Sequence, residues 1–435
     1  MQIRVGLTTN DLTKLTHKTV TVSSTDGLTC RPHDSTFSEK GARGQTLTVT
    51  AKANVLQVSG LSLPPLKNGQ SIDIRSLGSS QLVVDNLKRA HGAANPAPHY
   101  IGTIEIKPAG DSVRIILVTD MENYVKGVLQ SEIPASYHPE AIKAQAVAAR
   151  TYALRPRIDH TSDFANVCDS FLCCQYFAGV QTISANHAQA IVDTAGQILT
   201  DQGKPILALF SSNGGSCTEN YENCFSDPVT QEFPPPPLPY LKSESEKEFA
   251  ENRQSLTEDD LRSIWNNPAF LSADSWSPHF RWHVVMPASA LEAHMHHEIE
   301  VLRADPSMTP FIVPPQSGKF GHIKSFKVTE RGRSGTAIEL LIDTSTGVWS
   351  VKKELVIRSL FKNSELKLAR LKSAKLFFDF KMDSLGLLSV VTVHGLGWGH
   401  GVGMQQTGAQ GWAKKGKTYK QILAHYFQGS EISQV

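Results

Sequence analysis

The chain has 435 residues, 40% of them hydrophobic, and 43 basic and 41 acidic side chains give a formal net charge of +2 at pH 7. This length allows a large core and more than one lobe, and the balance of charges does not favour a nucleic-acid or polyanion-binding protein. No apolar run approaches the roughly 20 residues of a membrane span, and the opening residues MQIRVGLTTNDL lack the features of a secretory signal.

Residues 1–97 predict a β-rich N-terminal lobe. Short stretches of alternating polar and apolar residues, separated by turn sequences, are typical of strands. The predicted strands of the lobe cover residues 3–7, 19–24, 46–51, 55–60, 71–76 and 81–85. Two further strands, at 100–106 and 112–118, lead into a helical segment.

Two helices are predicted after residue 118. Asp120 is a suitable N-cap for the first helix, and Pro134 disfavours helical conformation in Ile133, so that the helix must end there. Pro139 suits the first turn of the second helix. A stripe of small residues between positions 142 and 153 would let another backbone approach this helix closely.

Glu132 lies at the junction of these two helices and is the candidate catalytic residue. The carboxyl end of a helix disfavours an ionised carboxylate, and the apolar Ile133 and Pro134 follow directly. Such surroundings favour a carboxylic acid that stays protonated, as a general acid must. A surface glutamate that merely ends a helix is the competing interpretation.

The segment from residue 160 to 179 contains one histidine and three cysteines. Zinc takes about four nitrogen or sulfur ligands in a tetrahedron, and the segment could supply them with His160, Cys168, Cys173 and Cys174. A disulfide, natural in an oxidising compartment, and buried free thiols are the alternatives. Farther on, Cys217 and Cys224 flank a short loop and predict a disulfide rather than a metal site.

Two glycine-rich segments are the candidate substrate-binding loops. The first, SSNGGSCTEN, begins at residue 211, and the second, GLGWGHGVG, has glycine at every second position from 395 to 403. If its backbone is extended, the four intervening side chains would project from one face, with an aromatic ring and an imidazole suited to a glycan. The expected contact residues are Ser211, Ser212, Gly214, Gly215, Thr218, Trp398, His400, Gly401 and Gln406. A purely structural glycine-rich loop is the alternative.

Residues 245–320 predict a polar insertion of helical and irregular structure. Its histidines at 294, 296 and 297 are expected to lie on a solvated helix face rather than at a metal. From residue 321 to 435 the pattern favours strands at 323–332, 336–343 and 348–361, then two short helices at 405–413 and 419–427. Gly429 suits the C-terminal cap of the last helix.

Several of these segments together resemble the SpoIID family, the sporulation stage II protein D and LytB-like peptidoglycan lytic transglycosylases. Residues 124–154, YVKGVLQSEIPASYHPEAIKAQAVAARTYAL, are similar to the family signature at nearly every position. The loops at 168–179, 211–219 and 395–409 resemble C-x(4 or 5)-C-Q-x-Y/F-x-G, S-S-x-G-G-x-T-E and G-x-G-x-G-H-G-V-G-M/L-S-Q-x-G-A. The sequence departs from these family patterns at two positions. Cys173 stands where the family commonly has histidine, and Gln405 stands where it usually has serine.

The resemblance implies an α+β fold of mixed antiparallel sheets with a short helical catalytic core, made of residues 98–244 and 321–435. It implies non-hydrolytic cleavage between N-acetylmuramic acid and N-acetylglucosamine, which leaves 1,6-anhydro ends. Glu132 would act as general acid and then as base, with Glu140 and Glu219 in reserve. A glycosidase that uses water would ordinarily need a second carboxylate.

The resemblance also implies partners and a cofactor. Peptidoglycan glycan strands are the expected partner, outside the cytoplasm in the periplasm or cell envelope. A non-catalytic cell-wall-binding protein that enhances an amidase is the alternative function, with the amidase as a possible partner. Some family members hold zinc in the cysteine-containing loop, which implies a structural zinc bound by His160, Cys168, Cys173 and Cys174.

Overall fold

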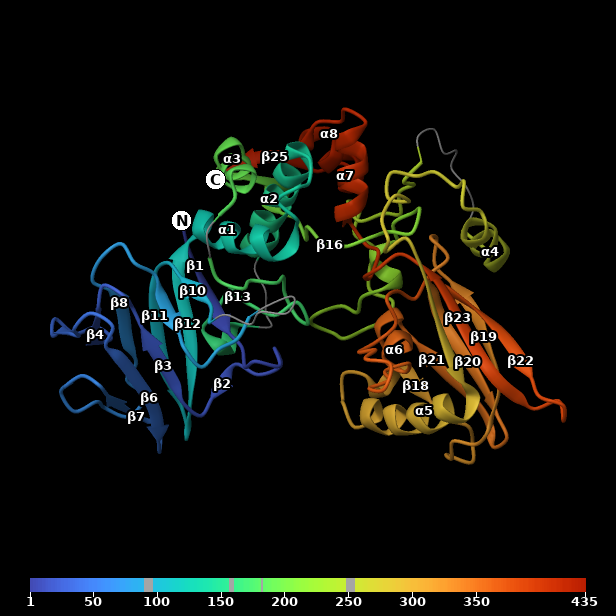
Figure 1. Ribbon diagram of the computed structural model, residues 1–435, viewed down its shortest axis with the longest axis horizontal. Coiled ribbons are helices and arrows are strands. Elements are labelled where there is room, and N and C mark those ends of the chain that lie inside the picture. The colour runs from blue at the N-terminus through green and yellow to red at the C-terminus, as the bar shows by residue number, and fades with distance from the viewer. Residues whose placement is uncertain (90–96, 156–159, 181–182, 248–254) are drawn as a thin grey trace. The chain divides into compact units, whose positions relative to one another are not determined.

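The chain folds into two units in the computed structural model, which describes residues 1–89, 97–155, 160–180, 183–247 and 255–435 (Figure 1). Unit 1 comprises Met1–Leu207 and Ile432–Val435, and unit 2 comprises Ala208–Glu431. Each unit combines helices with mainly antiparallel sheets, so that the predicted α+β class is confirmed. The division falls after Leu207, whereas the sequence suggested boundaries after residues 97, 244 and 320.

Two sheets of unit 1 contain the predicted N-terminal strands. The eight-stranded sheet has the order β13 (Val167–Cys168), β1 (Gln2–Leu7), β12 (Ser112–Asp120), β11 (Thr103–Ala109), β8 (Ile72–Ser76), β4 (Leu28–Pro32) and β5 (Glu39–Lys40), with β2 (Thr16–His17) beside β12. The five-stranded sheet has the order β10 (His99–Tyr100), β9 (Leu82–Val84), β3 (Val20–Ser23), β6 (Thr46–Lys52) and β7 (Val55–Ser59).

The two sheets enclose the core of unit 1 because alternate residues of each strand point inward. In β6, for example, Leu47, Val49 and Ala51 are buried while their neighbours are half-buried or exposed. Strand β1 pairs with β12 along its whole length. Strands β1, β4 and β8 therefore belong to the same sheet as β12, which leads into the helical segment, and residues 1–97 are not a separate lobe.

Three helices and a third sheet complete unit 1. The helices are α1 (Met121–Glu132), α2 (Pro139–Leu154) and α3 (Ala185–Asp193), with the short 3-10 helix η1 (Thr161–Asp163). The sheet has the order β15 (Lys204–Pro205), β14 (Gln197–Asp201) and β25 (Glu431–Gln434). The predicted start and end of α1 are confirmed, because Asp120 caps it by accepting from Asn123 N at 2.9 Å and Ile133 is already extended.

A buried arginine joins α1 to α2. The guanidinium of Arg150 is fully buried, and its Nη2 lies 2.6 Å from Oε2 of Glu122. Its Nη1 donates to the carbonyl of Gln197 in β14 at 2.9 Å. The charged guanidinium of Arg150 can be buried beside the small residues of α2 because its N–H groups have hydrogen-bond partners. The arginine thus fixes how the helix that carries Glu132 packs on its neighbours.

Unit 2 contains three sheets. The first is the parallel pair β16 (Phe210–Ser211) and β24 (Met404–Gln405). The second has the order β17 (Arg281–Pro287), β23 (Leu388–Leu396) and β22 (Leu376–Met382). The third has the order β18 (Ile312–Val313), β21 (Gly347–Lys352), β20 (Ala337–Thr344) and β19 (Ile323–Arg331). Because β17 pairs with β23, residues 245–320 are integrated into a sheet rather than forming a separate insertion.

The helices of unit 2 include both predicted C-terminal helices. They are α4 (Glu258–Asn266), α5 (Ala288–Arg303), α6 (Glu354–Ser359), α7 (Gln406–Lys414) and α8 (Tyr419–Tyr426), with η2 (Tyr221–Asn223) and η3 (Thr309–Phe311). The prediction of one strand over 348–361 is wrong in its second half, since Lys353 has a φ of 71° and the chain turns there into α6. In the part of the chain that the structure describes, no helix is long and apolar enough to span a bilayer.

The histidines of α5 occupy the solvated side of that helix, as the sequence predicts. His296 and His297 are exposed and His294 is half-buried, while Leu291, Met295 and Ile299 face the core. The ring of His296 stacks on Phe320 with 6.0 Å between centroids. The side chains are therefore part of a helix surface and its packing.

Candidate functional site

Glu132 is the last residue of α1 and is half-buried at the surface of unit 1. Its Oε1 accepts a hydrogen bond from the backbone N–H of Tyr176 at 2.7 Å. The carboxyl group is therefore held in one orientation by a segment that lies far from it in the sequence.

The segment that holds Glu132 is the loop after the cysteines, residues 174–179. Gln175 is buried, and its Nε2 donates to Oη of Tyr124 at 2.9 Å and to the carbonyl of Ala149 at 3.0 Å, so that it joins α1 and α2. The N–H of Ala178 donates to Oγ of Ser131 at 3.0 Å. The loop thus binds the end of α1 at both Ser131 and Glu132.

Gly127 explains why the loop can approach α1 so closely. An added Cβ at this position would collide with the ring of Phe177, which also stacks on Tyr124 with 5.2 Å between centroids. The family-like spacing of tyrosine, glycine and glutamate in α1 therefore matches the glutamine and phenylalanine of the loop. These residues form one packed unit around Glu132.

The two reserve carboxylates have structural partners. Glu140 lies at the start of α2, and its Oε1 is 3.0 Å from Nζ of Lys143. Glu219 belongs to unit 2 and is fully buried, where it accepts from Ser334 N at 2.9 Å, Ser334 Oγ at 2.7 Å and Arg333 N at 3.0 Å. It also accepts from Asn220 N and Asn223 Nδ2, each at 2.8 Å. Glu219 therefore anchors the turn at residues 332–335 and has no access to a substrate.

The four predicted zinc ligands come together in unit 1. Their ligand atoms all lie within 4.8 Å of one another. Nε2 of His160 is 3.3 Å from Sγ of both Cys173 and Cys174, and these two sulfurs are 4.0 Å apart. A tetrahedron with Zn–S bonds of about 2.3 Å and Zn–N bonds of about 2.0 Å separates its ligand atoms by roughly 3.5 to 3.8 Å. The residues present therefore fit a zinc ion.

One thiol of this cluster favours the charged form that binds a metal ion. Hydrogen bonds with Cys168 and Cys174 lower the pKa of the Cys173 thiol, so that a thiolate is favoured. Hydrogen bonds to Cys173 and Cys174 raise the pKa of His160 to about 10, so that without metal the protonated ring pairs with the thiolate, and a zinc ion would have to displace this proton. Nδ1 of His160 lies 3.5 Å from Oδ2 of Asp163, the type of carboxylate that orients a metal-bound imidazole.

In unit 2, the two glycine-rich segments pair with each other. Strands β16 and β24 run in parallel, and Oγ of Ser211 donates to Oε1 of Gln405 at 2.9 Å. The N–H of Thr407 donates to the carbonyl of Ser212 at 3.0 Å. All nine predicted substrate-binding residues are thus brought together in unit 2, whereas Glu132 and the candidate zinc ligands belong to unit 1.

The backbone of the second glycine-rich segment is not extended, so that the predicted common face is wrong. Gly397 and Gly401 have φ of 81° and 77°, in the left-handed region that favours glycine. Leu396 and Val402 are buried, whereas the Trp398 side chain is 40% exposed. A Cβ at Gly397 would lie 2.6 Å from the carbonyl oxygen of Asn213, while one at Gly401 would have its nearest neighbour at 4.0 Å. Most of the glycines therefore serve internal packing.

His400 is engaged within the protein through both ring nitrogens. Nε2 donates to the carbonyl of Phe210 at 3.1 Å, and Nδ1 accepts from the N–H of Val402 at 3.0 Å. Desolvation lowers the pKa of His400 to about 4, so that the ring is neutral. Its nitrogens orient the glycine-rich segment, and a sugar could meet only the ring surface.

Asn213, which the sequence analysis passed over as a variable position, joins the two segments. It exchanges backbone hydrogen bonds with Trp398 at 2.9 and 3.0 Å, and its Nδ2 donates to Oγ1 of Thr407 at 2.8 Å. Lys375 was also missed: it is buried, and its Nζ donates to the carbonyls of Gly214 at 2.6 Å and Cys217 at 2.7 Å. Neither has a sequence signal, because the bonds to Thr407, Gly214 and Cys217 each join residues more than 150 positions apart.

The predicted disulfide between Cys217 and Cys224 is not formed, and both cysteines are free. Sγ of Cys217 lies 3.2 Å from Oγ of Ser243, whereas Sγ of Cys224 donates to the carbonyl of His400 at 3.4 Å. Each thiol thus has its own partner, and burial raises the pKa of Cys217 to about 11.

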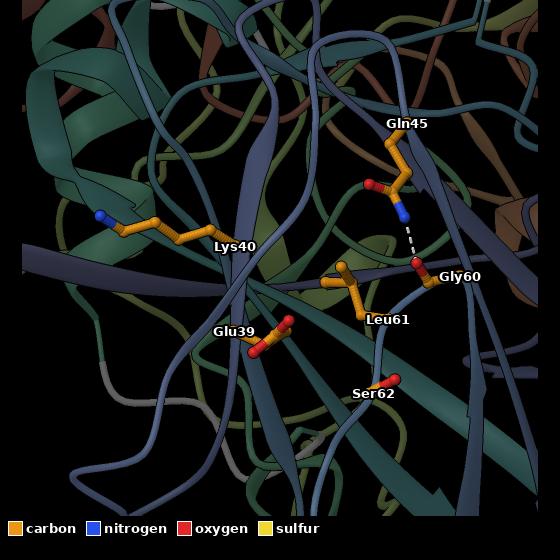
Figure 2. A pocket seen from close by; sticks show the side chains of 6 residues that line it. All are labelled: Glu39, Lys40, Gln45, Gly60, Leu61 and Ser62. Carbon is orange, nitrogen blue, oxygen red and sulfur yellow. Dashed lines mark hydrogen bonds between the residues drawn. The ribbon is translucent and has the colours of Figure 1, made fainter.

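A surface hollow in unit 1 lies outside these groups of residues. Figure 2 shows its lining by Glu39, Lys40, Gln45, Gly60, Leu61 and Ser62, with a hydrogen bond from Gln45 to the carbonyl of Gly60. It shares no residue with the predicted site. These six residues include one carboxylate and no imidazole or thiol.

Comparison with known proteins follows the same division of the chain. A family model described as Stage II sporulation protein, SpoIID, matches residues 109–200, which include α1, α2 and the cysteine-containing loop. This match and the similar proteins below support assignment of the chain to the SpoIID family. A second model, described as a domain of unknown function (DUF8618), matches residues 228–403. The SpoIID signature thus lies in unit 1, while most of unit 2 matches a domain without an assigned role.

The proteins to which this chain is similar include sporulation proteins and an amidase enhancer. Stage II sporulation protein D of Bacillus subtilis (strain 168) is 27% identical over 403 residues, which cover 89% of this chain and 95% of that protein. The protein of the same name from Bacillus amyloliquefaciens is 27% identical over 331 residues, 72% of this chain and 74% of its own. The Amidase enhancer of Bacillus subtilis (strain 168) is 25% identical over 320 residues, 71% of this chain and 40% of its own.

Proposed function

We propose that this protein acts on the bacterial cell wall outside the cytoplasm, as a lytic transglycosylase of peptidoglycan. It cleaves the bond between N-acetylmuramic acid and N-acetylglucosamine without water and leaves 1,6-anhydro ends. Glu132 protonates the glycosidic oxygen and then, as a carboxylate, takes the proton of the muramic 6-hydroxyl as the ring closes. One carboxyl group is sufficient for both steps.

The observation that carries this proposal is the contrast among the three carboxylates. Glu219 is buried with five donors and Glu140 is paired with Lys143, whereas Glu132 is half-buried at a helix end and held by Tyr176 N–H. A hydrolytic glycosidase usually needs two carboxyl groups about 5 to 9.5 Å apart on either side of the bond. Neither candidate partner, the buried Glu219 nor the lysine-paired Glu140, supports such a pair with Glu132, so that an internal nucleophile such as the 6-hydroxyl is favoured.

A non-catalytic amidase enhancer is the second candidate, and the similarity to the Amidase enhancer of Bacillus subtilis favours it. In that case the unit 2 loops would bind glycan and a cell-wall amidase would be the partner. Binding alone does not need an acid held as Glu132 is held. The enzyme is therefore the better supported of the two.

Digestion of purified sacculi with this protein decides between the candidates. The proposal expects soluble products whose mass spectra show 1,6-anhydromuramic ends, 18 Da lighter than the hydrolysed ends, in the absence of any amidase. Products with reducing muramic ends would instead indicate a hydrolase. No products alone, but faster release of peptides when an amidase is added, would establish the enhancer.

We also propose a structural zinc ion bound by His160, Cys168, Cys173 and Cys174. The separations among their ligand atoms and the favoured thiolate support this, and an ion there would join η1, β13 and the loop that holds Glu132. Four protein ligands leave no open position for a substrate, which is the pattern of a structural rather than a catalytic zinc.

Protein purified without chelator is expected to contain about one zinc per chain. Cys174→Ser should lower the zinc content and the midpoint of thermal unfolding of unit 1, because a ligand is lost. Cys217→Ser, which changes a free thiol of unit 2, is the matched control and should leave zinc content unchanged. Elemental analysis measures the zinc content, and thermal unfolding measures the stability. Wild-type protein that contains no zinc and unfolds at the same temperature as Cys174→Ser would refute the site.

A further inference from the structure

Trp276 stands on the surface of unit 2 in a fixed orientation. Its side chain is 45% exposed, and its indole Nε1 donates to the carbonyl of Thr407 at 3.1 Å. Nζ of Lys414 lies 5.0 Å from the ring centroid. The loop that carries it is itself braced, since Ser272 Oγ donates to Oδ1 of Asp274 at 2.6 Å and Ser277 N to the Asp274 carbonyl at 3.2 Å. The hydrogen bond of its indole N–H therefore holds the Trp276 ring in one orientation at the surface.

Trp398 is presented in a similar way from the glycine-rich segment. It is 40% exposed, and the ring of His279 packs perpendicular to its indole with 4.4 Å between centroids. Nζ of Lys372 lies 4.9 Å from its centroid. Each of the two exposed tryptophans therefore has a lysine at its ring.

One hydrogen-bond network connects the two rings. Asn213 pairs with the backbone of Trp398, and its Nδ2 donates both to Oγ1 of Thr407 at 2.8 Å and to the carbonyl of Asp274 at 3.0 Å. Thr407 in turn accepts the indole N–H of Trp276. Both rings are therefore fixed to the same buried amide, and we call Trp276, Trp398, Lys372 and Lys414 the tryptophan–lysine surface.

A run of exposed lysines begins with Lys414 at the Trp276 ring, although the whole chain is nearly neutral. Residues 414–420 contain four exposed lysines, Lys414, Lys415, Lys417 and Lys420. The carboxylates of the adjoining segments, Asp274 and Glu246, are fully buried and do not reach the surface. A negatively charged ligand would therefore meet aromatic rings and cations together.

We propose that the tryptophan–lysine surface of unit 2 is a binding site for an acidic glycan, made of residues other than the proposed acid Glu132. Indole faces suit the C–H faces of sugar rings, and lysines suit carboxylates attached to the sugars. A polyanion without rings would need only the lysines, and fixed, half-exposed indoles would then serve no purpose. Taking the natural ligand to be a peptidoglycan strand rests on the proposed function, whereas the ligand class does not.

The test measures binding by calorimetry at low salt to the full-length Glu132→Gln protein, so that turnover does not interfere. The probes are hyaluronan oligosaccharides, which carry N-acetyl sugars and carboxylates, neutral chitin oligosaccharides, and polyglutamate, which carries carboxylates without sugars. Trp276→Ala should weaken binding of both oligosaccharides about tenfold. Lys414→Ala should weaken hyaluronan about threefold, with little effect on chitin.

Two variants guard against indirect effects. Leu271→Ala removes a 79% exposed side chain near the same loop and should leave binding unchanged. Trp276→Phe keeps an aromatic ring without the indole N–H and should retain most of the affinity if stacking is the reason for it.

The proposal is overturned if Trp276→Ala binds both oligosaccharides like its parent. It is also overturned if polyglutamate binds as tightly as hyaluronan, because the lysines would then form a general anion site. Failure of the proposed function is distinguishable, since it would appear as undiminished digestion of sacculi by Glu132→Gln while the binding results stand.

Discussion

Glu132→Gln should abolish cleavage of peptidoglycan while the fold and glycan binding remain intact. The amide keeps the size of the side chain and can still accept the hydrogen bond from Tyr176 N–H. It cannot donate and recover a proton, and loss of general acid–base catalysis typically lowers rates by about 10²- to 10⁴-fold. Anhydromuramic products from sacculi measure the rate, and thermal unfolding measures the fold.

Glu140→Gln is the matched control for this variant. It removes a nearby carboxylate whose ion pair with Lys143 lies at the surface, where such pairs contribute about 0 to 1 kcal/mol. Its digestion rate should stay close to wild type. If Glu132→Gln retained activity within a few-fold of wild type, the acid would have to be another residue.

Glu219→Ala, unlike Glu132→Gln, should strongly lower the stability of unit 2. The buried carboxylate accepts from Arg333 N, Ser334 N and Ser334 Oγ, and its removal leaves these donors without a partner in the interior. Each unsatisfied buried donor costs about 1 to 3 kcal/mol, so that a loss of about 3 kcal/mol or more is expected in the unfolding of unit 2.

Denaturant unfolding followed by tryptophan fluorescence measures this loss, because unit 2 contains Trp276, Trp398 and other tryptophans. Glu365→Ala, which removes an exposed carboxylate of the same unit, should change the unfolding free energy by less than about 0.5 kcal/mol. A Glu219→Ala protein as stable as wild type but inactive would restore Glu219 as a catalytic candidate.

The local part of this architecture could be predicted from the sequence. Asp120, Pro134 and Pro139 set the ends of α1 and α2 through cap and ring geometry that act within a few residues. The alternation of the N-terminal strands predicted their inward faces for the same reason. The clustering of His160 with three cysteines followed from the choice of residue types in one short segment.

The long-range part could not be predicted. Glycine at every second position is compatible with an extended strand. The positive φ of Gly397 goes together with the close approach of Asn213, a residue distant in the sequence, and could not be read from the pattern. The burial of Glu219 could not be predicted from the sequence, because its partners Arg333 and Ser334 are more than 110 residues away. Burial and pairing, rather than residue type, distinguish the proposed acid Glu132 from Glu140 and Glu219.

The pairing of β16 with β24 has a consequence for the order of folding. It joins Ser211 to Gln405 across 194 positions, so that closing this contact costs more chain entropy than forming the hairpin of β19 and β20. We therefore expect the antiparallel hairpins of unit 2 to form first and the two glycine-rich segments to meet late. Until they meet, Trp398 lacks the backbone of Asn213 against which it is held, so that the proposed glycan-binding surface would be completed only in the last step of refolding.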